Sequence, residues 1–184
     1  MKHITLLITF VALLIPTVAI RADTATVDLS ADPSTRAQQA IALAVAQGQN
    51  VQTTASELAA FITELENPSF VLAEAQSYTT SAQSVKQYKC RASTSGTFTG
   101  LTVNWWAYAR VDGGRIQGDP YDEGFNHSYY GVPGSYAVVT GSVTAYTNNG
   151  GRRIRLDMNG TASFWFLSIP VGTTSLNLTC SKNA

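Results

Sequence analysis

The only two cysteines of the chain, Cys90 and Cys180, bracket a long run of alternating apolar and polar residues that glycine and asparagine interrupt. Alternation with a period of two is typical of β-strands that bury one face. If the cysteines pair with each other, they close a loop of about 90 residues, which the chain-entropy model credits with roughly 4–5 kcal/mol. This feature predicts an antiparallel β domain over residues 87–184, closed by a disulfide.

The alternation divides this domain into seven to eight strands. Val103, Trp105 and Ala107 share one face of a well-marked strand, and residues 135–146 alternate equally clearly. Turn signals separate the strands, at residues 112–114, 148–151, 159–160 and 170–172. Short strands at regular spacing indicate a compact antiparallel β-barrel, with a β-sandwich as the alternative.

The first residues have the pattern of a secretory signal peptide, over residues 1–22. Lys2 precedes an apolar stretch at 4–15, Pro16 follows it, and Ala22 offers a small residue at a cleavage site. The alternative is an uncleaved anchor, but the stretch is short for a span of ~20 residues. We therefore expect a secreted protein with no transmembrane segment after cleavage, in a compartment where the cysteines oxidise.

Between the signal and the β domain, the sequence predicts a flexible terminus at 23–31 and a preface of short helices at 32–86. Asp32-Pro33 is a helix start, with a capping carboxylate before a proline. Thr54 and Glu57 form a capping box before a second helix, and a third segment begins at Ser69. The preface is expected to be a lid or buttress on the β domain, with a propeptide or partner-binding arm as the alternative.

Charge excludes one class of partner. Twelve basic and twelve acidic residues give a formal net charge of zero. Only 13% of residues are charged, about half of the usual ~25%. The chain thus lacks the broad positive surface that binds nucleic acid, and its low charge suits an extracellular β protein.

The order of these elements resembles the virulence-associated protein (Vap) family of secreted bacterial β-barrels. The likeness is best over residues 134–146, 154–158 and 160–179, where the stretch GTASFWF precedes a final hairpin. The resemblance implies a glycine-rich antiparallel barrel and an extracellular location. The family is associated with host interaction and with membranes of the phagocytic compartment, and with no known reaction.

The region 118–134 is expected to be the longest irregular stretch of the β domain. It contains Asp119, Asp122, Glu123 and His127. These residue types bind Ca²⁺ or Zn²⁺ and perform acid/base chemistry, but their spacing matches no recognised metal loop or catalytic motif. A solvated loop is the preferred interpretation, so we expect neither a metal nor another cofactor.

Aromatic residues are the stronger functional signal. Trp106 and Tyr108 fall on the strand face opposite the apolar alternation, and further tyrosines crowd the 118–134 region. Exposed aromatic rings favour a ligand, a glycan or a membrane interface, unless the preface helices cover them. The candidate ligand-binding residues are Trp106, Tyr108, Tyr121, Tyr129 and Tyr130.

Together these features predict a secreted, non-enzymatic β-barrel that binds a host or environmental surface, with a lipid, a glycan or a host surface molecule as ligand. Two alternatives remain: a membrane-disrupting toxin whose preface inserts, and a small secreted hydrolase that uses His127. Asn126, Asn159 and Asn177 begin glycosylation triplets, which matter if the source is eukaryotic.

Overall fold

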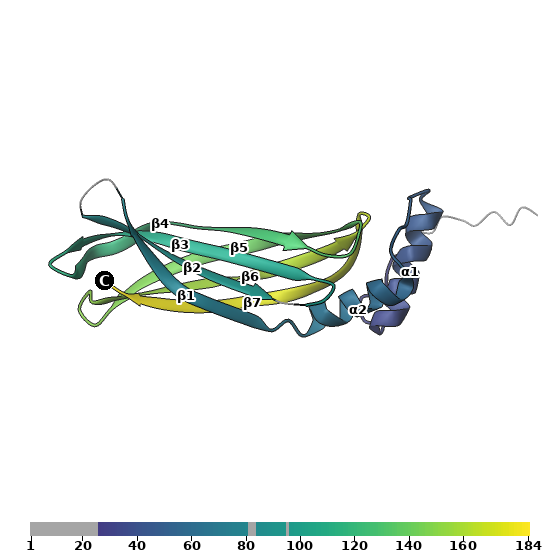
Figure 1. Ribbon diagram of the computed structural model, residues 1–184, viewed down its shortest axis with the longest axis horizontal. Coiled ribbons are helices and arrows are strands. Elements are labelled where there is room, and N and C mark those ends of the chain that lie inside the picture. Colours follow the sequence, from purple (N-terminus) through teal and green to yellow (C-terminus); the bar gives the residue numbers. More distant parts are fainter. Residues whose placement is uncertain (1–25, 81–83, 95) are drawn as a thin grey trace, which may run out of the picture.

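The computed structural model describes residues 26–80, 84–94 and 96–184, so the expected signal peptide lies outside the described residues. Two helices stand at one end of an elongated body of seven strands (Figure 1). The mainly β class is as the sequence predicts, but one of the seven strands lies outside residues 87–184, the range predicted to contain seven to eight. The elements are α1 (Pro33–Ala46), α2 (Ala55–Glu66), β1 (Phe70–Thr79), β2 (Val85–Thr94), β3 (Gly100–Asp112), β4 (Arg115–Tyr130), β5 (Ser135–Asn148), β6 (Arg153–Phe166) and β7 (Ile169–Asn183).

The strands form two antiparallel sheets, in the orders β1-β2-β3-β4 and β5-β6-β7. Each strand pairs with the next along the chain, so the topology is a succession of hairpins. The inward side chains of both sheets meet in one core, because alternate residues of a strand point to the same face. The largest fully buried side chains of the strands are Trp105, Tyr88, Phe164, Phe166, Leu101, Ile154, Leu156, Met158 and Leu176.

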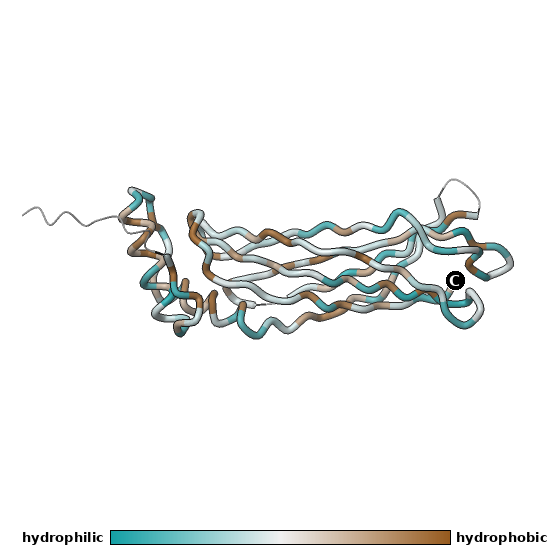
Figure 2. Tube along the Cα trace, turned by 180° about the vertical axis from the view of Figure 1, so that it is seen from behind, coloured by the Kyte–Doolittle hydropathy of each residue, from teal (hydrophilic) through white to brown (hydrophobic). Residues whose placement is uncertain are grey.

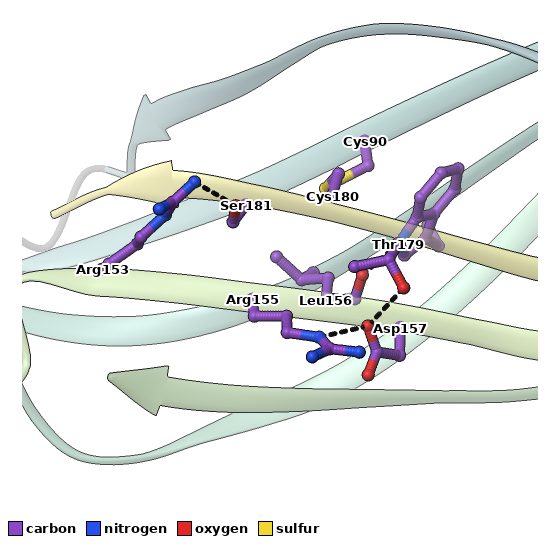
Figure 3. The surroundings of a disulfide bond; sticks show 9 residues. Cys90, Arg153, Arg155, Leu156, Asp157, Thr179, Cys180 and Ser181 are labelled. Atoms are coloured by element: carbon purple, nitrogen blue, oxygen red, sulfur yellow. Dashed lines mark hydrogen bonds and ion pairs between the residues drawn. A yellow bond between two sulfur atoms is a disulfide. The ribbon is translucent and has the colours of Figure 1, made fainter. Parts of the chain in front are cut away.

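The predicted disulfide joins the two sheets. Cys90 on β2 and Cys180 on β7 are bonded, with their Cα atoms 6.4 Å apart (Figure 3). Cys90 is buried beside Trp105, its register partner on β3. The indole Nε1 of Trp105 donates to the carbonyl of Leu156, 3.3 Å away in the opposite sheet. The bond and this contact hold the sheets face to face.

Both predicted helix starts are confirmed. Asp32 Oδ1 accepts hydrogen bonds from the backbone N–H groups of Ser34 and Thr35, at 3.0 and 3.1 Å. Thr54 and Glu57 make the reciprocal contacts of a capping box. Side-chain caps of this kind satisfy backbone donors that have no partner inside a helix. The backbone contacts lower the pKa of the Glu57 carboxyl, and the contact with the Thr35 hydroxyl lowers that of Asp32.

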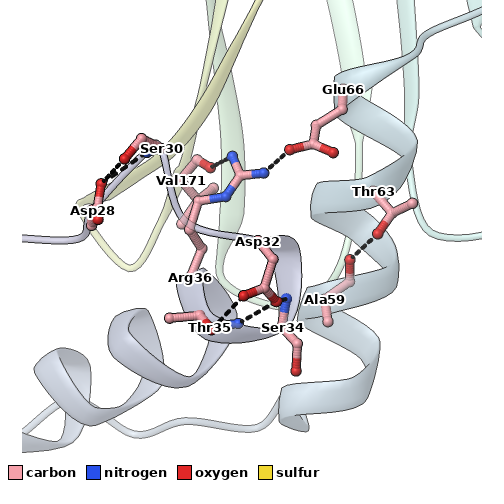
Figure 4. A network of polar contacts seen from close by, with 10 residues as sticks. All are labelled: Asp28, Ser30, Asp32, Ser34, Thr35, Arg36, Ala59, Thr63, Glu66 and Val171. Atoms are coloured by element: carbon pink, nitrogen blue, oxygen red, sulfur yellow. Dashed lines mark hydrogen bonds and ion pairs between the residues drawn. The ribbon is translucent and has the colours of Figure 1, made fainter.

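The helices pack on one end of the sheets. Phe61 of α2 meets Phe164 of β6 edge to face, with ring centroids 6.4 Å apart. The buried Arg36 of α1 donates to the carbonyl of Val171, 3.3 Å away, and pairs with Glu66 (Figure 4). Because these contacts reach β6 and β7, the helical pair covers the core at that end.

The segment just before α1 also packs on it. Val27 is buried, and the backbone N–H of Asp28 donates to Gln39 Oε1 at 2.9 Å. Both residues belong to the stretch 23–31, which the sequence predicts to be a flexible terminus. In the part of it that the structure describes, they contact the rest of the protein.

The prediction of a third helix in the preface is wrong, because the segment that begins near Ser69 forms the edge strand β1. A bulge between Ala73 and Gln76 adds one residue opposite β2, and Ala75, within the bulge, is the buried residue of the strand. A bulge breaks the period of two, and the resulting spacing of apolar residues resembles that of a helix. The β structure therefore begins at Phe70 rather than at residue 87.

The turn predictions are right where the glycine adopts a positive φ. They are wrong where the glycine lies within a strand. Gly113 and Gly114 turn β3 into β4 with φ of 53° and 71°, and residues 149–151 turn β5 into β6. Gly160, expected in a turn, lies inside β6 opposite Gly141, where a Cβ would overlap the neighbouring backbone. The last hairpin turns at Leu167 and Ser168, not at residues 170–172.

The predicted irregular stretch at 118–134 is mostly strand β4. The pairing with β3 shifts register twice, between Trp106 and Tyr108 and between Tyr108 and Arg110. Gly118 and Asp122 have positive φ of 75° and 51° within these shifts. Extra residues at bulges are where a strand tolerates glycine, proline and charged groups, and this explains why the sequence looks like a loop.

Candidate ligand-binding face

The structure places the five candidate aromatic residues in three locations. Trp106, Tyr108 and Tyr121 lie on the outer face of the β1–β4 sheet, since their neighbours Trp105 and Ala107 point into the core. Tyr130 lies on the same sheet at its helical end. Tyr129 points inward.

Tyr108 and Tyr121 form the centre of the outer group. They are register partners on β3 and β4, and their rings stack with centroids 6.3 Å apart and planes at 28°. Trp106 precedes Tyr108 by two residues on the same face, a separation of about 7 Å along the strand. Its indole lies against Gly124, where a Cβ would come within 2.7 Å of the ring.

A fourth ring joins this group from β1. Tyr78 pairs with Gln87, which in turn pairs with Tyr108, so Tyr78, Gln87, Tyr108 and Tyr121 form one row across four strands. Tyr78 and Tyr121 are 48% and 37% exposed. We call Tyr78, Trp106, Tyr108 and Tyr121 the outer aromatic face. Tyr78 is not predictable from the sequence pattern, because the segment has helical spacing and a helix assignment does not reveal which sheet face the ring occupies.

Polar groups and two shallow hollows border this face. Lys89 pairs with Trp106, so its side chain lies on the same surface as the indole. One hollow, of about 310 Å³, is lined by Arg110, Gln117, Gly118, Asp119 and Tyr121. The other, of about 220 Å³, is lined by Ala73, Glu74, Gln76, Lys89, Cys90, Arg91 and Asn104. The rings thus stand between hydrogen-bonding groups on both sides.

Tyr129 and Tyr130 have other surroundings. Tyr129 packs on Phe164 with centroids 6.0 Å apart, its hydroxyl lies 2.8 Å from Ser135 Oγ, and burial raises its pKa. Tyr130 is 59% exposed, and its ring covers Gly100 at the helical end of β3. Tyr129 therefore contributes to the core, and Tyr130 stands apart from the outer aromatic face.

The acidic residues and His127 do not converge. Asp119, Asp122 and Glu123 are exposed along β4, and four residues separate Glu123 from His127, about 13 Å of strand. His127 Nε2 lies 3.4 Å from the carbonyl oxygen of Ala137 on β5. Within residues 26–80, 84–94 and 96–184, no group of three or more His, Cys, Asp or Glu side chains is arranged to hold a metal ion.

The second sheet carries an aromatic pair that the sequence analysis did not select. Tyr136 and Trp165, partners on β5 and β6, stack with centroids 6.0 Å apart and planes at 5°. Tyr136 is 42% exposed. Their alternation with Ala137 and Phe164 is the signal that could have placed both rings on the outer face of this sheet.

Neither described helix is long and apolar enough to cross a membrane. Comparison with known proteins found no matching protein family, no matching curated protein and no matching solved structure.

Proposed function

We propose that this is a secreted, non-enzymatic protein that binds a carbohydrate of a host or environmental surface through the outer aromatic face. The observation that carries the proposal is the stacked pair Tyr108–Tyr121, with Trp106 two residues away on the same strand. Ring faces bind apolar C–H surfaces, and a sugar presents such a surface between its hydroxyl groups. Gln87 and Lys89, in the same rows of the sheet, supply hydrogen-bond donors for those hydroxyls.

The position of the rings on paired strands supports binding rather than packing alone. Strands of a hydrogen-bonded sheet hold their side chains at fixed spacing, so little conformational entropy is lost when a ligand binds. Tyr78 and Tyr121 remain well exposed although both are large and apolar. Exposed aromatic clusters of this kind mark interaction sites.

Secretion is part of the proposal. The signal-peptide pattern of residues 1–22 and the Cys90–Cys180 bond both favour it, because disulfides persist in oxidising compartments. The resemblance to the virulence-associated family also favours an extracellular role at a host surface.

We further propose that the two sheets close into one flattened barrel, which would fix the outer face on a rigid body. Contacts between the sheet edges support this closure. The Ile116 N–H of β4 donates to the carbonyl of Gly151, 2.7 Å away in the β5–β6 turn. At the other seam, Lys182 of β7 pairs with Glu74 of β1 at 3.2 Å.

The test is a glycan array with the oxidised protein, followed by titration of the oligosaccharide that binds best. Tyr121→Ala and Tyr108→Ala each remove one ring of the stack, and we expect roughly tenfold weaker binding from each. Tyr136→Ala is the matched control, because Tyr136 is 42% exposed on the other sheet and stacks there on Trp165. Equal affinity in all three variants, or no binding on the array, would contradict the proposal.

A further inference from the structure

The end of the molecule opposite the helices carries a hollow of about 560 Å³. Its lining residues belong to the β3–β4 and β5–β6 turns and to the last residues of β7. These three segments lie at the same end of the molecule (Figure 1). Three arginines, Arg115, Arg152 and Arg153, line the hollow together with Asn149 and Asn183. We call these five residues the arginine tip. Figure 2 shows hydrophilic residues gathered at these turns.

We propose that the arginine tip binds phosphate groups of an anionic phospholipid surface, so that the protein docks end-on. Guanidinium groups match a phosphate because their N–H donors form a planar fork that bonds two oxygens at once. The amides of Asn149 and Asn183 add donors, and the hollow is large enough for a headgroup phosphate with its ester oxygens.

All three arginines are exposed, and Arg115 has the carboxylate of Asp112 as its register partner across the β3–β4 turn. No Asp or Glu side chain lines the hollow. The ion pairs found among the described residues use other cations, namely Arg36 with Glu66, Arg155 with Asp157 and Lys182 with Glu74. Within this region Arg153 Nη2 donates to a neutral partner, Ser181 Oγ, at 2.6 Å (Figure 3). Like charges held close together repel, and an anion between them removes that repulsion.

The charge of the whole molecule points in the same direction. Residues 26–69, which form the helical end, contain five carboxylates and one arginine, a net charge of −4. Residues 70–184 contain six carboxylates and nine basic residues, a net charge of +3. In the field of an anionic surface this distribution turns the tip toward the surface and the helices away from it.

A tyrosine at the level of the tip supports a lipid surface over free phosphate. Tyr146 pairs with Arg155, two residue pairs from Asn148–Arg153, so its Cα atom is about 7 Å from that of Asn148 along β5. The side chain is 51% exposed. Tyrosine is enriched at the headgroup level of membranes, where its ring and hydroxyl meet apolar and polar surroundings together.

The experiment is co-sedimentation of the oxidised protein with vesicles of phosphatidylcholine alone and of phosphatidylcholine with phosphatidylglycerol. The tip variant is Arg152→Gln/Arg153→Gln. The control is Lys89→Gln/Arg91→Gln, which removes the same charge from the middle of the first sheet, where Lys89 and Arg91 pair with Trp106 and Asn104. We expect binding only to the acidic vesicles, and roughly 25-fold weaker binding of the tip variant, from about fivefold for each arginine.

Two outcomes overturn the proposal. Equal weakening in both double variants would mean that net charge alone drives binding, and no sedimentation with acidic vesicles would exclude lipid docking. A titration with inorganic phosphate, monitored by NMR through the amide resonances of residues 149–153, distinguishes binding of free phosphate from binding of a lipid phosphate. Shifts with phosphate but no vesicle binding would assign the tip to free phosphate and refute the lipid.

Discussion

Glu64 shows how one side chain can organise a turn that is remote in sequence. Its carboxylate accepts hydrogen bonds from three successive backbone N–H groups, those of Thr97, Phe98 and Thr99, at 2.9, 3.1 and 3.0 Å. These donors belong to the β2–β3 connection, and Glu64 lies in α2. The contact therefore fastens the helical pair to the first sheet, as Arg36 fastens it to the second.

We predict that Glu64→Ala lowers the free energy of unfolding by about 1–3 kcal/mol, because partly buried backbone donors lose their acceptor. Urea unfolding followed by circular dichroism measures the change. Glu74→Gln is the control, since the Glu74 side chain is 89% exposed in its pair with Lys182, and such pairs contribute roughly 0–1 kcal/mol. A loss for Glu64→Ala no larger than that of the control would show that the contact is unimportant.

At the scale of elements, the two helices are short and rely on the strands for their stability. Helices of 14 and 12 residues are marginal by themselves in water. Burial of one face of α2 supplies the stability that helix propensity alone does not. The buried residues are Leu58, Phe61, Ile62 and Leu65. The helical end should therefore be coupled to the core through Phe61 and its partner Phe164.

We predict that Phe61→Ala destabilises the protein by about 3–5 kcal/mol, from lost burial and from the cavity that remains. Thermal unfolding with both far-ultraviolet and tryptophan signals measures it. Thr63→Ala on the exposed side of the same helix should change stability by no more than about 0.5 kcal/mol. If Phe61→Ala melts the helical signal and leaves the strands at their original midpoint, the helices are a separate unit and the coupling is refuted.

For the whole molecule, the disulfide adds a second covalent link between the two sheets, besides the backbone of residues 131–134. Hairpins join strands that are neighbours in the chain, whereas Cys90 and Cys180 connect strands 90 residues apart. Closing so long a loop in the unfolded state removes much of its conformational freedom. The stability of the pair of sheets should therefore depend on oxidation more than on any single surface contact.

We predict that Cys90→Ala/Cys180→Ala loses about 4–5 kcal/mol of stability, which guanidinium unfolding of oxidised and variant protein would measure. The far-ultraviolet spectrum of the variant should keep its β character, because the strand pairings do not involve sulfur. Reduced wild-type protein is the control, because it lacks the disulfide bond but keeps both cysteine side chains. Equal midpoints for oxidised and reduced protein would contradict the prediction.

The candidate site was only half predictable. Alternation along β3 was enough to place Trp106 and Tyr108 outward, because a strand with one buried face assigns its other face to solvent. It was not enough for Tyr129, whose inward direction depends on the bulges of β4, nor for Tyr78. The arginine tip was also hidden, because Arg115 and Arg152 are 37 residues apart and meet only when two hairpins end together.

The sequence by itself determined the features whose causes are local or chemical. The caps at Asp32 and Thr54, the turn at Gly113 and the pairing of two cysteines each follow from a few neighbouring residues or from the sulfur itself. Tertiary structure alone decided that the segment at Phe70 became an edge strand and that Gly160 lies within the central strand β6. Both outcomes depend on a partner strand, whose backbone the residue must pair with or approach, and local preference contains no information about that partner.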